Sequence, residues 1–322
     1  MRVDDEASIS AAMDALTSWD IEVQSAEVYS RSENVVVRIV DRQDAVYALR
    51  IHRPGYNSIE ELRAELIWET ALNQSGIATP PHVLTRTGEG YVEVAINGRP
   101  YQVGLIRWIP GKILDELIHD AGEADQVHYF AQLGRLLAAL HQHTAGWQPD
   151  QSFVRRSWNA DGLVGSDPLW GRFWEASFLN RKEAQVLRKA RDVIHERLLS
   201  IGEDPAVYGL IHADLHPRNV IVHDGTLQAI DFDDSGFGWH YYDLAVALRE
   251  FIGHERYVEF RDAMLEGYRF VRALPLAEER LPLFLCVRGL VTVGWAAARP
   301  EIVNPEQMKP HVSNLVGELS EL

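Results

Sequence analysis

Three side chains with oxygen ligands lie at short spacing between residues 211 and 234. Asp214 is followed by Asn219 five positions later and by Asp231 twelve positions after that. A carboxylate can orient or accept the proton of an attacking hydroxyl, and carboxylate and amide oxygens are the ligands that Mg²⁺ prefers. Transfer of a phosphoryl group requires such a base and such a metal site. The set therefore predicts phosphoryl transfer, with Asp214 as the base and Asn219 and Asp231 as metal ligands.

The residues between Asn219 and Asp231 predict how these side chains are brought together. Two apolar runs, 220–222 and 227–230, flank the turn at Asp224-Gly225. Asp-Gly between such runs is the strongest short signal for a β-hairpin. A hairpin folds back on itself, so we expect the residue before its first strand and the residue after its second to meet at one end.

Further motifs lie in order around this hairpin. His212 precedes Asp214, the segment 231–233 reads Asp-Phe-Asp, and Asp243 lies in 241–245, which reads Tyr-Tyr-Asp-Leu-Ala. The pattern H-x-D-x-x-x-x-N followed by D-F-x is the kinase catalytic-loop signature. With its downstream motif, the block resembles the aminoglycoside phosphotransferase and choline kinase-like superfamily, the small-molecule relatives of the eukaryotic protein kinases.

The resemblance implies a fold, an activity and a set of roles. The fold would be α+β and protein-kinase-like, with a small antiparallel-sheet N-lobe over 1–106 and a mainly helical C-lobe over 107–322. The activity would be transfer of the γ-phosphate to a hydroxyl, with ATP and Mg²⁺ as cofactors. His212 would hold the loop backbone, Asp243 would accept N–H bonds from that loop, and Asp233 would touch a second metal or the substrate.

The first third of the chain predicts the sheet and helix of an N-lobe. Helical spacing of apolar residues marks 7–19 and 59–73. β-Rich runs lie at 35–40, 45–51, 91–96 and 101–106. The order strand, strand, helix, strand, strand is that of a kinase N-lobe, and Pro110-Gly111 then interrupts the chain. We therefore expect the domain boundary near 107–111.

A kinase N-lobe places a strand cation on the α- and β-phosphates and holds it with a helix carboxylate. Arg50 occupies the strand position where lysine is usual, and Glu65 is its expected partner, with Glu60, Glu61 and Glu69 near enough to be alternatives. A guanidinium stays charged and can grip phosphate oxygens in a bidentate manner. The alternative for Arg50 is a solvated charge on an edge strand.

Two backbone segments are expected to contact the nucleotide. A turn at Ser32 and Asn34 would cover the phosphates, although it contains no glycine and a plain polar hairpin turn is the alternative. The segment that joins the predicted lobes would contact adenine through the carbonyl of Arg107 and the amide of Ile109.

The rest of the chain predicts helices at 124–143 and 183–199 and a helical tail over 239–294. His141, beside the apolar stripe of the first of these helices, is expected to pack in the core rather than to bind a ligand. The stretch 146–170 is irregular and carries tryptophans and arginines. These residues line an acceptor pocket or cap the helical core.

Composition restricts the class of protein. A net charge of −16 argues against nonspecific nucleic-acid binding, which needs clustered basic residues. The single cysteine, Cys286, excludes an intramolecular disulfide and suits a reducing compartment. The first residues are acidic, unlike a secretory signal, and no run approaches the ~18 apolar residues of a membrane span. We expect a cytoplasmic enzyme, monomeric or homodimeric, without nucleic-acid or membrane partners.

The acceptor hydroxyl is left open among aminoglycosides, amino alcohols, homoserine-like amino acids and sugars. The layout also resembles bacterial stress-response and homoserine-type kinases, so phosphorylation of protein Ser/Thr is an alternative. Asp243 follows Asp231 by only 12 positions. This leaves little platform for an extended peptide and favours a small molecule.

Two other classes compete with a kinase. A metal-dependent hydrolase would use the H-x-D-x-H motif at 212–216, completed by Asp231, Asp233 and His240. That hypothesis does not explain the spacing of Asn219 or the expected Arg50 pair. A nucleotide-binding pseudokinase would lack catalysis, against which the intact Asp/Asn/Asp set argues.

Overall fold

The computed structural model describes residues 4–320, and these fall into two compact units. Unit 1 holds the chain up to Gly111 together with Pro149–Val154 and His223–Asp233. Unit 2 holds Lys112–Gln148, Arg155–Val222 and the chain from Asp234 onward.

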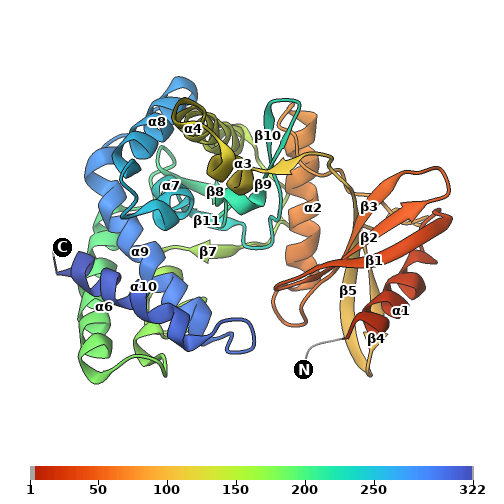
Figure 1. Cartoon of the computed structure of the whole chain (residues 1–322), viewed down its shortest axis with the longest axis horizontal. Helices are drawn as coiled ribbons and strands as arrows, with labels where there is room; N and C mark the ends of the chain where they lie inside the picture. The colour runs from red at the N-terminus through yellow and green to blue at the C-terminus, as the bar shows by residue number, and fades with distance from the viewer. Residues whose placement is uncertain (1–3, 321–322) are drawn as a thin grey trace. The chain divides into compact units, whose positions relative to one another are not determined.

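Unit 1 is built on an antiparallel sheet (Figure 1). Its elements are α1 (Asp5–Leu16), β1 (Val23–Arg31), β2 (Val35–Asp41), β3 (Val46–Ile51), α2 (Ile59–Gln74), β4 (Tyr91–Ile96), β5 (Arg99–Arg107) and β10 (Thr226–Ala229). The sheet has the strand order β1-β2-β3-β5-β4. Each neighbouring pair in it is antiparallel.

Unit 2 is mainly helical. Its helices are α3 (Leu114–Asp120), α4 (Glu123–Gly146), α5 (Ala160–Val164), α6 (Arg181–Ile201), α7 (His240–Leu248), α8 (Tyr257–Val271), α9 (Ala277–Ala297) and α10 (Pro305–Leu319). Its strands are β6 (Lys112–Ile113), β7 (Arg156–Trp158), β8 (Tyr208–Ile211) and β11 (Gly236–Trp239), and β9 (Val220–His223) ends where unit 2 gives way to unit 1. This division into an antiparallel sheet and a mainly helical part confirms the predicted α+β class.

The two faces of the unit 1 sheet differ because side chains alternate along a strand. On β3, Leu49 and Ile51 pack with α1 residues such as Ala12 in one buried cluster. Arg50 lies between Leu49 and Ile51 on β3. Its side chain therefore points to the opposite face of the sheet, where it donates to Glu65 of α2. The predicted alternative, a solvated edge-strand charge, is wrong: β3 is an inner strand, and Arg50 is 8% exposed.

Most predicted elements are present with shifted ends. The helix expected at 7–19 runs Asp5–Leu16, since Asp4 caps it by accepting from Ala7 N–H. The Asp224-Gly225 turn has positive φ at both residues, 48° and 73°, as a two-residue hairpin turn requires. Strand β1 was not predicted, because most of its residues are exposed and it lacks the alternation of apolar side chains that marks a half-buried strand.

Helix α9 forms the buried centre of unit 2. By length and composition alone this helix of 21 residues could cross a membrane. However, 67% of its most apolar stretch is buried inside the structure. Cys286 lies in this helix, is buried and forms no disulfide.

Candidate active site

The loop after β8 is held in place by Asp243, in the first turn of α7. The Asp243 carboxylate accepts hydrogen bonds from the backbone N–H groups of His212, at 3.0 Å, and Ala213, at 2.6 Å. Ala213 has a φ of 66°, a conformation that costs a non-glycine residue about 1–2 kcal/mol. These bonds offset that cost. Both bonds are of the kind expected of Asp243, and its role in organising a catalytic loop stays a prediction.

Asp243 is itself oriented by a second buried side chain. His141 of α4 lies 3.0 Å from the Asp243 carboxylate through Nε2 and 2.8 Å from the Tyr268 hydroxyl through Nδ1. The ring of His240 stacks on His141 at 4.3 Å. Burial raises the pKa of Asp243 to about 6 and lowers the pKa of His141 to about 3. His141 is a fully buried packing residue, as predicted, and it supports the loop through Asp243.

Asp214 is the partly exposed carboxylate that this loop presents. Its side chain is 21% exposed and accepts from Asn219 Nδ2 at 3.1 Å and from Arg288 Nη2 at 2.7 Å, with His216 Nε2 at 3.5 Å. Burial tends to raise the pKa of Asp214, but His216 and Arg288 outweigh it and hold that pKa well below its usual value. Asp214 is thus ionised over the physiological range.

Asn219 lies beside Asp214, as the motif spacing predicts. Its Nδ2 also donates to the Asp214 carbonyl at 3.0 Å, so both bonds of the amide nitrogen are directed to one residue. The amide oxygen is the atom left to ligate a metal. His212 is fully buried, and its Nδ1 accepts from the Asp214 N–H at 3.3 Å, which fits the expected structural role.

Arg288 was missed by the sequence analysis, although a signal for it exists. It is the one charged residue among positions 281–298, an otherwise uncharged stretch of α9. A charge inside a buried helix is costly unless it is paired, so an isolated arginine in such a run indicates a partner elsewhere. Here the partner is Asp214.

In unit 1, Arg50 is surrounded by three carboxylates. Its Nη1 donates to Glu65 at 3.0 Å, and its Nη2 lies 2.6 Å from Asp231 and 3.0 Å from Asp233. Burial opposes the charged guanidinium, but Asp233, Asp231 and Glu65 outweigh it and raise the pKa of Arg50. The predicted pairing with Glu65 is present, and Glu65 is fully buried.

Asp231 and Asp233 differ in exposure although they are two residues apart. The Asp231 side chain is 43% exposed and its φ is 67°, so a strained backbone presents this carboxylate to solvent. Asp233 is buried, accepts from Asn34 Nδ2 and lies 3.7 Å from His52 Nδ1. Burial lowers the pKa of His52 to about 4, so this imidazole is neutral at pH 7.

The other predicted nucleotide contacts occupy varied surroundings. Asn34 is 5% exposed, and its amide is bonded to Asp233 and to the N–H of Arg53, whereas Ser32 is exposed. The guanidinium of Arg107 lies 4.7 Å from the centre of the Tyr47 ring, and Ile109 is partly buried. Contacts of Ser32, Asn34, Arg107 and Ile109 with a nucleotide stay predictions.

The residues of the alternative hydrolase site do not form a metal cluster. Positions 212–216 lie in a loop after β8 rather than on a strand, so they do not share one strand face. His240 stacks on His141 in the core. Across residues 4–320, no group of three or more His, Cys, Asp or Glu side chains could hold a metal ion.

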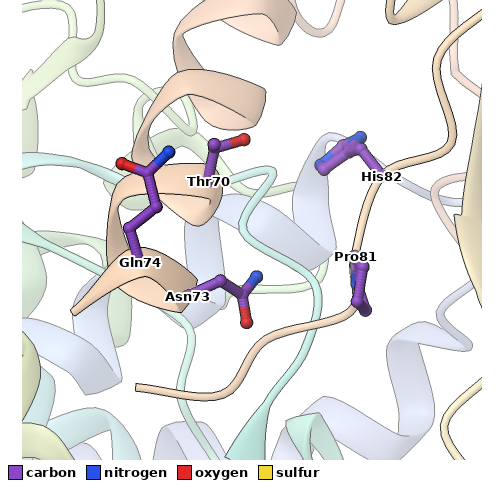
Figure 2. Close-up of a pocket in the computed structure, with 5 residues that line it drawn as sticks. All are labelled: Thr70, Asn73, Gln74, Pro81 and His82. Carbon is purple, nitrogen blue, oxygen red and sulfur yellow. The ribbon is translucent and has the colours of Figure 1, made fainter. Parts of the chain in front are cut away.

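Two pockets lie away from these residues. One, of about 400 Å³, is lined by Thr70, Asn73, Gln74, Pro81 and His82 at the end of α2 (Figure 2). Another, of about 350 Å³, is lined mainly by α9 together with residues such as Tyr257 and Glu318. Neither is lined by a predicted site residue.

Comparison with known proteins relates the whole arrangement to one family. Residues 26–280 match the family model described as Phosphotransferase enzyme family. Amicoumacin kinase of Bacillus subtilis (strain 168) is 26% identical over 67% of this chain and 60% of that protein. A homoserine kinase of Azorhizobium caulinodans is 30% identical over 66% of this chain and 61% of that protein. The chain spans 46% to 70% of the length of the curated relatives it matches.

Solved structures match over nearly the full chain. The microcompartment-associated aminopropanol kinase is 30% identical, with a TM-score of 0.81 over 97% of this chain and 94% of that one. The amicoumacin kinase hAmiN, solved with AMP-PNP, Ca²⁺ and Ami, is 22% identical, with a TM-score of 0.79 over 99% of this chain and 94% of that one, and shows the fold alone. These matches confirm the predicted kinase-like fold and the predicted family resemblance.

Proposed function

The chain belongs to the Phosphotransferase enzyme family, and we propose that it transfers the γ-phosphate of ATP to a hydroxyl of a small polar molecule. The observation that carries this proposal is the setting of Asp214. Its carboxylate is partly exposed, ionised, and held by Asn219 and Arg288 on a loop that Asp243 clamps. A fixed carboxylate of this kind can orient an acceptor hydroxyl toward phosphorus.

Asp214 would act by position more than by basicity. The Arg288 guanidinium and the His216 imidazole beside it hold the pKa of Asp214 low and make the carboxylate a weak proton acceptor. Because the transition state of phosphoryl transfer is loose, little proton abstraction is needed before the phosphorus–oxygen bond to the leaving group weakens. The hydroxyl proton then passes to Asp214 late in the step, when the new bond has formed.

The proposed metal ligands are Asn219 and Asp231, the pair that the motif predicts. Their donor set, one amide oxygen and one exposed carboxylate, fits Mg²⁺, which takes oxygen ligands and completes its shell with phosphate oxygens and water. A bound Mg²⁺ would neutralise charge on the transferred group. Arg50, fixed by Glu65, would bind the α- and β-phosphates, and Asp233 would keep that guanidinium oriented.

A small acceptor is favoured over a protein. Only a turn at 233–234 and β11 separate Asp231 from α7 along the chain, so an extended peptide finds little platform in this part of the chain. The relatives are named as kinases for amicoumacin, homoserine and aminopropanol. Within the small-molecule class, amino alcohols, hydroxy amino acids, sugars and aminoglycosides all carry a suitable hydroxyl.

A screen with radiolabelled ATP across these four acceptor classes tests the function. Asp214→Asn should lower turnover about 10²–10⁴-fold while ATP binding stays near wild type, because the orienting carboxylate is lost. The melting temperature should fall somewhat, since Arg288 loses its charged partner, so turnover is measured at a temperature where the variant is folded. Asp224→Asn is the matched control, since Asp224 is an exposed carboxylate on the nearby turn and Asn tolerates its positive φ. Equal activity of the Asp214→Asn variant and the wild type would refute the assignment.

A further inference from the structure

Arg288 bonds to a second side chain besides Asp214. Its Nη2 donates to Asp214 at 2.7 Å, and its Nη1 donates to the Tyr242 hydroxyl at 3.4 Å. These bonds use two of the five N–H groups that a guanidinium carries in a rigid fork. The side chain is 12% exposed, so the guanidinium is largely enclosed but not sealed from solvent.

The aromatic neighbours of Arg288 leave this fork available. The Arg288 Cζ lies 5.3 Å from the centre of the Trp170 ring, and the Arg299 Cζ lies 5.9 Å from the same ring. An aromatic ring satisfies the face of a guanidinium but not its N–H groups, which point along the plane. Contact with the ring does not itself occupy the N–H groups, so a planar anion can still bond to them.

The short distance between Asp214 and Arg288 restricts which charged group can lie next to the acceptor's hydroxyl. An acceptor whose hydroxyl bonds to Asp214 has its next few atoms near Arg288, because the two side chains are in contact and both are partly exposed. An ammonium group at that place would be repelled by the guanidinium, and a carboxylate would be attracted. A short chain between the hydroxyl and the carboxylate fits this separation.

We propose that Arg288 binds the carboxylate of the acceptor, so that the substrate is a compact hydroxy acid such as a β- or γ-hydroxy amino acid. The inference rests on the proposed function, since it assumes that Asp214 receives the acceptor hydroxyl. It makes Arg288 a specificity-determining residue. It also separates this chain from a kinase that prefers an amino alcohol.

Matched acceptors with and without the carboxylate test the proposal. Homoserine is compared with 3-aminopropan-1-ol, threonine with 1-aminopropan-2-ol, and serine with ethanolamine, each pair differing by that group alone. The wild type should prefer the carboxylate member of at least one pair by more than about tenfold in kcat/KM, since a site built to bond a group rejects the analogue that lacks it. A preference for the amino alcohol in every pair overturns the proposal.

Variants of Arg288 assign the preference to this residue. Arg288→Met should remove the preference, mainly by raising the KM for the carboxylate member, and Arg288→Lys should retain part of it. A residue that only positions Asp214 would instead lower kcat equally for both members of a pair, and that result also overturns the proposal. Arg280→Met is the control, because Arg280 lies on the same helix and likewise contacts a tyrosine, Tyr241, through its guanidinium.

Binding measured by calorimetry without nucleotide separates this inference from the proposed function. If no acceptor is phosphorylated, the phosphotransferase proposal fails, but binding of homoserine by the wild type and its loss in Arg288→Met still support the anion site. Equal binding of homoserine and 3-aminopropan-1-ol, or binding of neither, counts against the site. Thermal unfolding of Arg288→Lys and Arg288→Met shows whether each variant is folded.

Discussion

At the scale of single residues, the unit 1 cluster depends on one guanidinium that meets three carboxylates. The side chains of Glu65 and Asp233 are buried, and the side chain of Asp231 is partly exposed. A planar fork can satisfy several oxygens at fixed angles, whereas an ammonium group acts as a single point charge. This geometry explains why arginine serves at the position where lysine is usual in a kinase.

Replacing Arg50 should therefore affect folding as well as nucleotide binding. Arg50→Met removes the cation that faces two buried carboxylates and should lower the free energy of unfolding by about 3–5 kcal/mol. Arg50→Lys should keep part of the stability and should weaken ATP binding at least about tenfold, because one bidentate contact is lost. Denaturant unfolding and calorimetry with ATP measure the two effects.

The matched control for Arg50 is Arg42→Met, an exposed arginine that follows β2 and pairs with exposed Glu22. It should change the free energy of unfolding by less than about 0.5 kcal/mol. ATP affinity in Arg50→Lys equal to that of the wild type would argue against a phosphate contact by this side chain.

At the scale of elements, the catalytic loop depends on how closely α4 and α8 approach each other (Figure 1). A Cβ atom on Gly134 of α4 would lie 2.1 Å from the Met264 carbonyl oxygen, and one on Gly267 of α8 would lie 2.0 Å from that of Ala131. The two helices carry His141 and Tyr268, whose hydrogen bond orients Asp243. The crossing therefore links helix packing to the position of Asp214.

Gly134→Ala should separate the two helices. We expect a loss of about 1–3 kcal/mol in the free energy of unfolding, as for overpacking of a close contact, together with reduced turnover. Gly146→Ala is the control on the same helix, where no atom lies within 4 Å of the added Cβ, and it should be neutral or stabilising by up to about 1 kcal/mol. Chemical denaturation of both variants measures the effect, and equal stability would contradict a tight crossing.

At the scale of the whole molecule, buried histidines determine how stability responds to acid. In the pair of Asp243 and His141, burial shifts the two pKa values in opposite directions, up for the carboxyl and down for the imidazole. Acid stabilises the fold through the first shift and destabilises it through the second, so the two effects oppose each other. This pair therefore contributes little pH dependence. His52 has no such compensation, since burial lowers its pKa to about 4.

The direction in which stability changes with pH follows from the linkage between proton binding and folding. Between pH 6.5 and 4 the unfolded His52 binds a proton that the folded one does not, so stability falls as the pH falls through this window. Below this window, where His52 is protonated in both states, the free energy of unfolding is lower by about 3 kcal/mol. His52→Gln should flatten the fall, and His119→Gln, at an exposed histidine, should leave it unchanged. Unfolding by urea at pH 7, 6, 5 and 4 checks this, and an unaltered slope in His52→Gln would assign the acid sensitivity elsewhere.

The sequence by itself determined the features that depend on near neighbours in the chain. The turns at Asn97-Gly98 and Asp224-Gly225 follow from residues that tolerate positive φ, which both turns adopt. Helix α4 follows from the spacing of its apolar residues. The contact of Asp214 with Asn219 follows from a five-residue spacing within one loop.

Only the tertiary structure decided the partners that complete these residues. Arg288 meets Asp214 across 74 positions, His141 meets Asp243 across 102, and Asn34 meets Asp233 across 199. Periodicity indicates which face of an element is buried but not which distant element will cover it. A polar side chain on that face finds its partner when the elements pack, because a buried charge or amide is stable only once it is hydrogen-bonded.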